Sequence, residues 1–275
     1  ILISITACKS GPTAEEGQVS SAVNSPSVNS EVAASNTPSE AQASVISTAD
    51  TGGSSQDAIS PYNVKPGEFN LYPRETNGWD ESGWSIITPS DDSRLIYVSS
   101  STGDDTTAEF YAPRDLVSVE EPGLIRPYKT IEAAYLNVRE GHPDWILLRR
   151  GDTWEVHDHV QLKAGRSVSE RSVITSYGES HQRPMIKSDA YETFRVWSDR
   201  TFIAISDVRF YAYKRDPESS EFSGWGQLTE STAIRIYSPK ETVMGTVLIE
   251  GSDFNYFSKG ISINGGGDVL DVVIR

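Results

Sequence analysis

The sequence has almost no cysteine and comparatively little basic charge. Its 275 residues include one cysteine, Cys8, so no disulfide can form within the chain. Lysine and arginine number 24 against 39 aspartates and glutamates, which gives a net charge of −15. Because phosphate backbones and anionic lipids attract basic surfaces, nucleic acid and an anionic membrane surface are poor general partners. The length still allows one or two domains with a real core.

Aromatic residues are missing from residue 9 to residue 60, a stretch rich in Ser, Ala, Thr, Asn, Glu and Pro. Such a segment cannot bury enough apolar surface to offset the entropy of ordering, so we predict a disordered tether. It follows Ile5-Thr6-Ala7-Cys8, which resembles a bacterial lipobox at the end of a signal peptide whose beginning is missing. An alternative is a buried cysteine in an apolar strand.

The lipobox interpretation assigns residues 1–8 to a signal-peptide remnant and residues 9–60 to the tether. It predicts lipidation at Cys8, attachment to a membrane through that lipid, and a location at the bacterial outer membrane or cell surface. Residues 61–93 then form an irregular lead-in that packs on the folded domain. Trp79 and Trp84 in this lead-in are alternatively a small sugar-binding patch, since aromatic rings stack on sugars.

The segment from residue 127 to residue 154 combines a short helix with a compact strand. Four apolar residues lie on one helical face, and Thr130 precedes them as a plausible N-cap; they are Ile131, Ala134, Tyr135 and Val138. An apolar run, residues 145–148, then predicts a strand that ends at a Gly-Asp turn. Residues 95–99 predict another strand before it.

These segments resemble a known architecture. A strand ending in Ser-x-x-Gly-Asp, then PYKTIEAA, then DWILLRRGDTW is similar to the N-terminal cap of right-handed parallel β-helix proteins, the pectate-lyase-like superfamily. SVITSYG with RPMI resembles their first rungs. The resemblance implies an all-β, right-handed parallel β-helix over residues 94–275 with a short capping helix. Its members include polysaccharide lyases, glycoside hydrolases, esterases and non-catalytic adhesins.

The apolar pattern supports a repeat independently. Ile203, Ile205, Val208 and Phe210 recur 44 positions later as Val247, Ile249, Ser252 and Phe254. Ile234 and Ile236 recur 27 positions later as Ile261 and Ile263, and Val247 and Ile249 recur 25 positions later as Val272 and Ile274. Periods in the twenties with alternating apolar residues suit stacked coils. The longer step predicts an insertion, residues 214–231. Because the sequence ends inside a strand pattern, we expect a fragment truncated at its C-terminus.

Equivalent outward residues of stacked coils become neighbours, which places Arg209 beside Asp253. With Lys214 they are our candidate catalytic residues: a cation for a uronate carboxylate and an aspartate as acid, base or metal ligand. The plainer interpretation is an exposed cross-strand ion pair. A hydrolase instead needs two carboxylates several ångströms apart, for which Asp199, Asp207 and Asp253 are the nearest pieces.

The candidate substrate-binding residues lie on the other repeated strand and in the insertion. Arg235 and Tyr237 align with Ser262 and Asn264 and face outward together; Arg215 and Trp225 add a second cation and an aromatic platform. Solvated decoration of a strand is the alternative. The resemblance and these residues predict a surface protein that handles extracellular polysaccharide, as a lyase or hydrolase, or else as a non-catalytic binding or adhesion protein.

Metal binding has little support in the sequence. His157 and His159 flank Asp158 and would share one face of a strand, a possible start of a zinc site, but no third ligand is identifiable. No metal site is therefore assigned. Calcium is the one cofactor that we still consider, because bound calcium could offset the protein's negative charge where an anionic polysaccharide binds. Asp104 and Asp105 could coordinate it, although hydrogen bonds within a turn are their commoner role.

Overall fold

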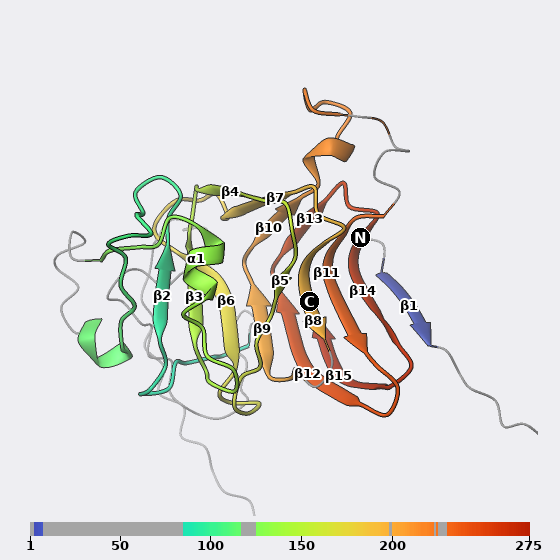
Figure 1. The fold of residues 1–275 in the computed structure, drawn as a ribbon, viewed down its shortest axis with the longest axis horizontal. Helices are drawn as coiled ribbons and strands as arrows, with labels where there is room; N and C mark the ends of the chain where they lie inside the picture. The colour runs from blue at the N-terminus through green and yellow to red at the C-terminus, as the bar shows by residue number, and fades with distance from the viewer. Residues whose placement is uncertain (1–2, 8–84, 117–124, 198–199, 223, 225–229) are drawn as a thin grey trace, which may run out of the picture. The chain divides into compact units, whose positions relative to one another are not determined.

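The computed structural model describes residues 3–7, 85–116, 125–197, 200–222, 224 and 230–275. Its strands pair in parallel, and helix is limited to α1 (Ile131–Tyr135) and the 3-10 turns η1 (Pro113–Leu116) and η3 (Tyr213–Arg215) (Figure 1). Within these ranges, no helix is long and apolar enough to span a membrane. Cys8, Trp79, Trp84, Asp199 and Trp225 lie outside the described residues.

The strands form three sheets. The first sheet contains β2 (Leu95–Val98), β3 (Trp145–Arg149), β6 (Ser172–Tyr177), β9 (Ile203–Ser206), β12 (Val243–Glu250) and β15 (Asp268–Ile274). The second contains β4 (Thr153–Val156), β7 (Met185–Ser188), β10 (Arg209–Tyr211) and β13 (Asp253–Asn255). The third contains β5 (Val160–Gln161), β8 (Glu192–Trp197), β11 (Thr232–Ser238), β14 (Lys259–Gly265) and β1 (Ile3–Ala7).

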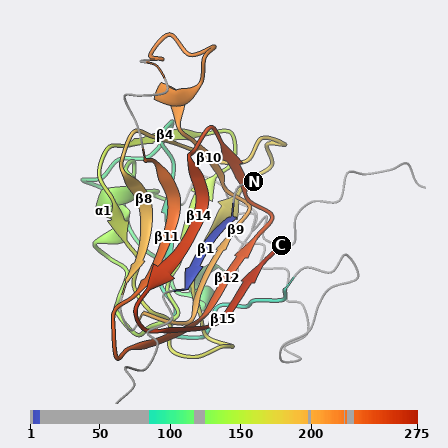
Figure 2. The ribbon, with the colours of Figure 1, turned by 90° about the vertical axis from the view of Figure 1, so that its right-hand side faces the viewer.

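From β3 onward the chain visits the three sheets in turn, so that every third strand returns to the same sheet. We call three such strands a circuit. Figures 1 and 2 show the result: β9, β12 and β15 lie side by side, as do β8, β11 and β14. Mostly parallel sheets built by this succession, with very little helix, are compatible with the predicted parallel β-helix. β1, from the predicted signal remnant, pairs with β14, with Ile3 opposite Ile261.

The strand register confirms the predicted repeats. Ile203 lies opposite Val247, and Phe210 lies opposite Phe254, as the 44-residue step requires. Ile234 faces Ile261 at the 27-residue step. The third step, of 25 residues, brings Val247 opposite Val272. These pairings follow because each alternating apolar residue must return to the interior in every circuit.

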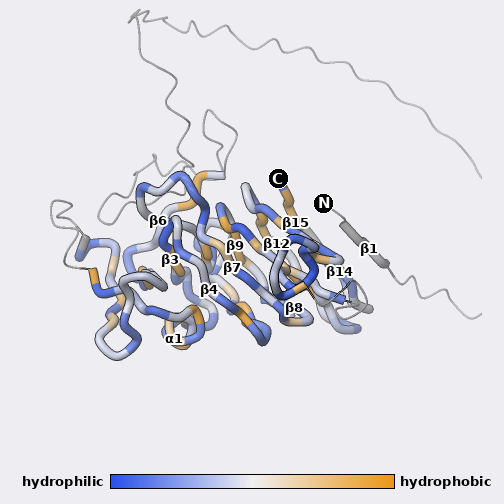
Figure 3. Tube along the Cα trace, turned by 90° about the horizontal axis from the view of Figure 1, so that it is seen from above, coloured by the Kyte–Doolittle hydropathy of each residue, from blue (hydrophilic) through white to orange (hydrophobic). Residues whose placement is uncertain are grey.

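The main core lies between the three sheets. Phe210 packs edge-on against Phe194 and stacks on Phe254, with ring centroids 5.3 Å apart in both cases. Hydrophobic and hydrophilic residues alternate along the strands (Figure 3). Helix α1 adds Ile131 and Ala134 to this core, and the Thr130 side chain caps it as predicted, although the helix ends at Tyr135 and Val138 lies beyond it.

The first sheet is buried on its outer face as well. Trp145, Val173, Ala204 and Leu248 form one apolar ladder there, and the described parts of the flanking segments cover it with Ile87, Tyr111 and Ile125. Strands buried on both faces carry continuous apolar runs. This explains why residues 145–148 show no alternation.

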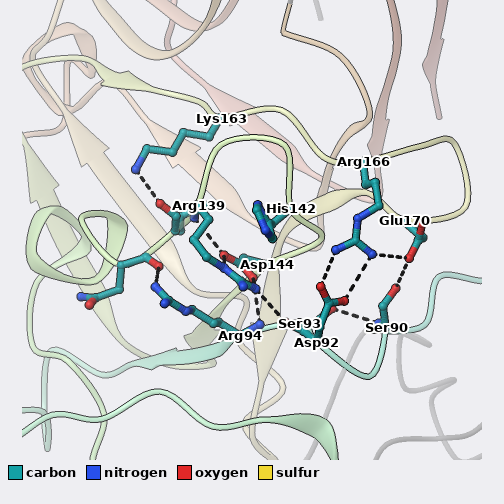
Figure 4. Close-up of polar contacts among 12 residues, drawn as sticks. Ser90, Asp92, Ser93, Arg94, Arg139, His142, Asp144, Lys163, Arg166 and Glu170 are labelled. Carbon is teal, nitrogen blue, oxygen red and sulfur yellow. Dashed lines mark hydrogen bonds and ion pairs between the residues drawn. The ribbon is translucent and has the colours of Figure 1, made fainter.

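A polar network attaches residues 90–93, which belong to the predicted lead-in, and the adjoining Arg94 to two loops of the fold (Figure 4). The fully buried carboxylate of Asp144 accepts hydrogen bonds from the Arg139 side chain and from the backbone N–H of Arg94. Arg166 pairs with both Asp92 and Glu170. The described residues at the end of the lead-in therefore contact the folded domain through charged groups that already have partners.

Candidate functional site

The outer face of the third sheet carries two arginines and two aromatic residues in register. Arg195 lies opposite Arg235, and Trp197 lies opposite Tyr237, on β8 and β11. Alternation dictates this placement, because the intervening Val196 and Ile236 point into the core. With Glu192 and His159, these four residues form what we call the arginine–aromatic face.

Glu192 holds both arginines. Arg195 Nε donates a hydrogen bond of 2.6 Å to one Glu192 carboxylate oxygen, and Arg235 Nε lies 3.2 Å from the other in an ion pair without hydrogen-bond alignment. The glutamate side chain is only 4% exposed, whereas those of Arg195 and Arg235 are 26% and 16% exposed. One negative charge is thus shared by two positive ones, and the face keeps one excess positive charge within a protein of net charge −15.

The aromatic pair stands beside the arginines. The Trp197 and Tyr237 rings stack with centroids 4.2 Å apart. The Arg195 guanidinium lies 5.3 Å from the Trp197 ring and that of Arg235 lies 5.7 Å from the Tyr237 ring, both within cation–π range. Next along the ladder, the side-chain oxygen of Asn264 is buried without a hydrogen-bond partner among the described residues.

The two histidines do not share a strand, so that prediction is wrong. β4 ends at Val156 and β5 begins at Val160, because the chain bends at Asp158 between the second and third sheets. His157 instead contacts Asp189, with 2.7 Å between its Nδ1 and the carboxylate. His159 contacts Arg195, with 3.1 Å between Nε2 and Nη1.

At the same corner, Asp189 joins His157 to Lys214, forming what we call the corner cluster. Lys214 Nζ donates a hydrogen bond to the Asp189 carboxylate, which is 16% exposed. Burial raises the pKa of Asp189, but the hydrogen bonds from Lys214 and His157 outweigh it, so the pKa is lowered overall. The same hydrogen bond raises the pKa of Lys214. Lys214 is therefore held as an ammonium ion.

The predicted insertion leaves the fold at this corner, between the end of β10 and the start of β11. Its described first part is fixed to the second sheet: Tyr211 Oη donates to Asp216 at 2.7 Å, and Arg215 Nε donates to the Tyr256 backbone carbonyl at 2.9 Å. Burial, then the hydrogen bond to Asp216, raises the pKa of Tyr211 to about 12. Lys214 and Arg215 thus both lie at the base of the insertion, as two neighbouring cations.

Arg209 and Asp253 are opposite one another on β10 and β13, as predicted, but they do not form the expected ion pair within the described residues. Asp253 is bound by Arg183 at 3.0 Å instead. Arg183 also donates to the buried Asp207 at 2.9 Å, and Arg150 and Ser176 donate to the other oxygen of Asp207. The side chain of Asp207 is 2% exposed and fully engaged, which makes it unsuited to acid–base chemistry.

No three His, Cys, Asp or Glu side chains lie close enough to hold a metal ion in the part of the chain that the structure describes. Asp104 takes the predicted turn role, whereas Asp105 does not, because its partners are 24 and 25 positions away. Asp104 accepts hydrogen bonds from Thr106, and Asp105 accepts from the backbone N–H of Lys129 and from Thr130.

Sequence reasoning found Arg235 and Tyr237 but missed Arg195, Trp197 and Glu192. The signal was present: Phe194 and Val196 alternate like Ile234 and Ile236, 40 positions earlier, so their outward neighbours align too. Comparison with known proteins adds nothing to these assignments, since no family model matches the chain and neither a curated protein nor a solved structure was found to be similar to it.

Proposed function

We propose that this protein is a right-handed parallel β-helix protein of the pectate-lyase-like kind that binds an anionic polysaccharide at the arginine–aromatic face. The three-sheet succession and the matching registers support the fold. One observation carries the binding proposal: two in-register arginines share one buried glutamate, so an excess positive charge stands beside a Trp–Tyr pair.

The chemistry of this face suits a sugar that carries a carboxylate. A guanidinium offers its N–H groups in a planar fork that matches a carboxylate. Glu192 lies at the Nε of each arginine and His159 at Nη1 of Arg195, which leaves Nη2 of Arg195 and the terminal nitrogens of Arg235 as donors for a ligand carboxylate. The exposed edges of Trp197 and Tyr237 provide apolar contact for the sugar ring. A neutral polysaccharide would contact the aromatic rings but would have no carboxylate for the arginines to bind.

The location follows from the sequence. The lipobox-like Ile-Thr-Ala-Cys8 and the tether behind it support a lipid-anchored protein at the outer membrane or cell surface, where polysaccharide is the available polymer. The tether would hold the folded domain at a distance from the anchor.

Cleavage by elimination is the second candidate function, and the corner cluster favours it. Asp189 orients His157 through Nδ1, and Nε2 of His157, 3.9 Å from a Glu155 carboxylate oxygen, would be the general base. In an elimination, the base takes the proton next to the uronate carboxylate, and the C–O bond to the leaving sugar breaks as a C=C bond forms. Lys214, held as a cation, would offset the charge that develops on the carboxylate.

The test is binding and turnover by the full chain on galacturonate and alginate polymers and on a neutral galactan, with and without calcium. We expect the protein to migrate more slowly in gels that contain the acidic polymers, and not to be slowed in gels that contain the galactan. Ultraviolet absorbance of an unsaturated uronate would show lyase activity in addition to binding. New reducing ends without this absorbance would indicate a hydrolase. Failure to bind any acidic polymer would contradict the proposal.

A further inference from the structure

We propose that His159 is a further ligand-binding residue of the arginine–aromatic face, and that it makes a carboxylate ligand bind more tightly in acid than in alkali. This inference rests on the proposed function, because it requires the ligand carboxylate to reach Arg195. It concerns a residue that contacts Arg195 in the neighbouring circuit and the adjacent Asp158.

The two contacts of the imidazole define its state. Nε2 of His159 lies 3.1 Å from Nη1 of Arg195. A guanidinium can only donate, so Nε2 must accept. Nδ1 lies 2.9 Å from the Asp158 carboxylate, which can only accept, so Nδ1 carries the proton. In this arrangement Nε2 is the acceptor and Nδ1 the donor, so a proton added to Nε2 would set two cations in direct contact.

A bound carboxylate changes this balance. When it takes the hydrogen bond from Nη1 of Arg195, Nε2 of His159 loses its donor and becomes free to accept a proton. The imidazolium would then stand between the Asp158 carboxylate and that of the ligand. Arg195 is the cation that faces it from β8; Glu192 and Arg235 lie beyond Arg195, so their charges act at longer range. Ligand and proton thus favour one another at this site.

The coupling acts in a testable range, because histidine exchanges its proton between about pH 5 and pH 8. Glutamine is the matched substitution: its side-chain oxygen can accept from Arg195 but cannot be protonated there. His181→Gln is the control, since the exposed His181 lies in the turn between β6 and β7, where, among the described residues, only its backbone carbonyl accepts a hydrogen bond, from Arg150. Both changed residues are outside the sheets, so the strands keep their pairing.

The experiment is titration calorimetry of the full chain with a galacturonate oligomer at about pH 5.5 and about pH 8, with a neutral galactose oligomer as reference. We expect wild type and His181→Gln to bind the acidic oligomer about tenfold more tightly at the lower pH, which corresponds to about one pKa unit of coupling. His159→Gln is expected to bind the acidic oligomer with the same affinity at both pH values. The ligand's own carboxylates stay ionised throughout this range.

Two results would overturn the inference while leaving the proposed function intact. One is tight binding of the acidic oligomer by wild type with no dependence on pH. The other is the same dependence on pH in His159→Gln as in wild type. Absence of binding by wild type at both pH values would instead contradict the proposed function itself. The circular dichroism spectrum of each variant verifies that it is folded.

Discussion

Asp207 and Gly251 occupy the same corner position in consecutive circuits. Each follows one member of the paired residues Ser206 and Glu250, and their φ angles are 57° and 56°. Glycine adopts this left-handed conformation readily, whereas a side chain is strained there. At the first of these two corners the left-handed residue is an aspartate, whose carboxylate binds Arg150 and Arg183 from the two preceding circuits.

Removing the Asp207 carboxylate is expected to destabilise the fold strongly. Asp207→Gly keeps the backbone conformation but leaves Arg150, whose side chain is 11% exposed, without its charged partner. Breaking a buried pair by removing one member costs about 3 kcal/mol or more. Asp207→Ala adds the strain of a left-handed alanine, about 1 kcal/mol. Urea unfolding measures the stability of both variants. We expect wild type to be the most stable, Asp207→Gly to be less stable and Asp207→Ala to be the least stable.

Asp253→Asn is the matched control for this prediction. It removes a second carboxylate bound by Arg183, but the Asp253 side chain is 43% exposed. Exposed pairs contribute about 1 kcal/mol at most. An Asp253 variant as unstable as Asp207→Gly would contradict the view that burial sets the cost.

Arginine-to-glutamine substitutions on the third sheet should weaken binding of an acidic oligomer. For Arg195→Gln and Arg235→Gln we expect a loss of about tenfold each, since a hydrogen bond to a charged group is worth about 1.5 kcal/mol or more. Arg209→Gln is the control: its side chain is exposed on the second sheet and has no polar partner among the described residues. Titration calorimetry gives the affinities.

The reverse change at the same face should strengthen binding. Glu192→Gln removes the negative charge that the two arginines share, so an acidic oligomer is expected to bind about tenfold more tightly. This opposite sign separates a charge effect from damage to the fold, which would weaken binding in every variant. If Glu192→Gln and Arg195→Gln lost equal affinity for the acidic oligomer, the proposal that this face binds a negatively charged ligand would be wrong.

Acid should release the insertion from the corner cluster. The folded pKa of Asp189 is lowered, so its pair with Lys214 stabilises the protein above the ordinary aspartate value of about 3.9, and this contribution is lost as the pH falls through the lower folded value. Asp189→Asn should therefore be less stable than wild type by about 1 kcal/mol at neutral pH, with the difference vanishing in acid. Urea unfolding from neutral pH to about pH 2.5 tests it, and a difference that stays constant would argue against the pair.

Alkali should destabilise the protein through Tyr97. Burial raises its pKa well above the ordinary value of about 10, so above that pH the unfolded chain ionises while the folded one does not, and stability falls. Its buried hydroxyl also has no hydrogen-bond partner among the described residues. Tyr97→Phe should therefore equal wild type or exceed it at neutral pH and exceed it increasingly above pH about 10. Unfolding midpoints against pH measure this.

Tyr135→Phe is the contrasting substitution. The Tyr135 hydroxyl accepts a hydrogen bond of 2.8 Å from the backbone N–H of Lys163, so its removal should cost about 1 kcal/mol at neutral pH. If Tyr97→Phe were as costly as Tyr135→Phe, the Tyr97 hydroxyl would have to have a partner.

The stacking of strands could be predicted from sequence because interior positions obey one rule in every circuit. Ile203 and Val247 had to be apolar and in register, whatever filled the 44 residues between them. Side-chain partners across circuits obey no such rule. Asp253 was predicted beside Arg209, which is correct for the backbone. The Asp253 carboxylate is bound instead by Arg183, which lies one circuit before Arg209.

The bend at Asp158 was missed for a related reason. The sequence from Trp154 to Gln161 alternates well enough to suggest one strand, but a three-sheet circuit has to turn there. The turn sends His157 and His159 to different partners. The continuous apolar run of residues 145–148 is typical of a strand buried on both faces, but it does not indicate what covers the outer face of the first sheet, since the covering residues come from distant segments.

The insertion leaves β10 and re-enters at β11 without disturbing the pairing of either strand with its neighbours. Steps of 25, 27 and 44 residues coexist because length varies at corners while the sheets keep one register. Chain length and strand register are therefore separate variables in this protein. Selection, or an engineer, can therefore exchange the loop that begins at the corner cluster and leave the supporting scaffold unaltered.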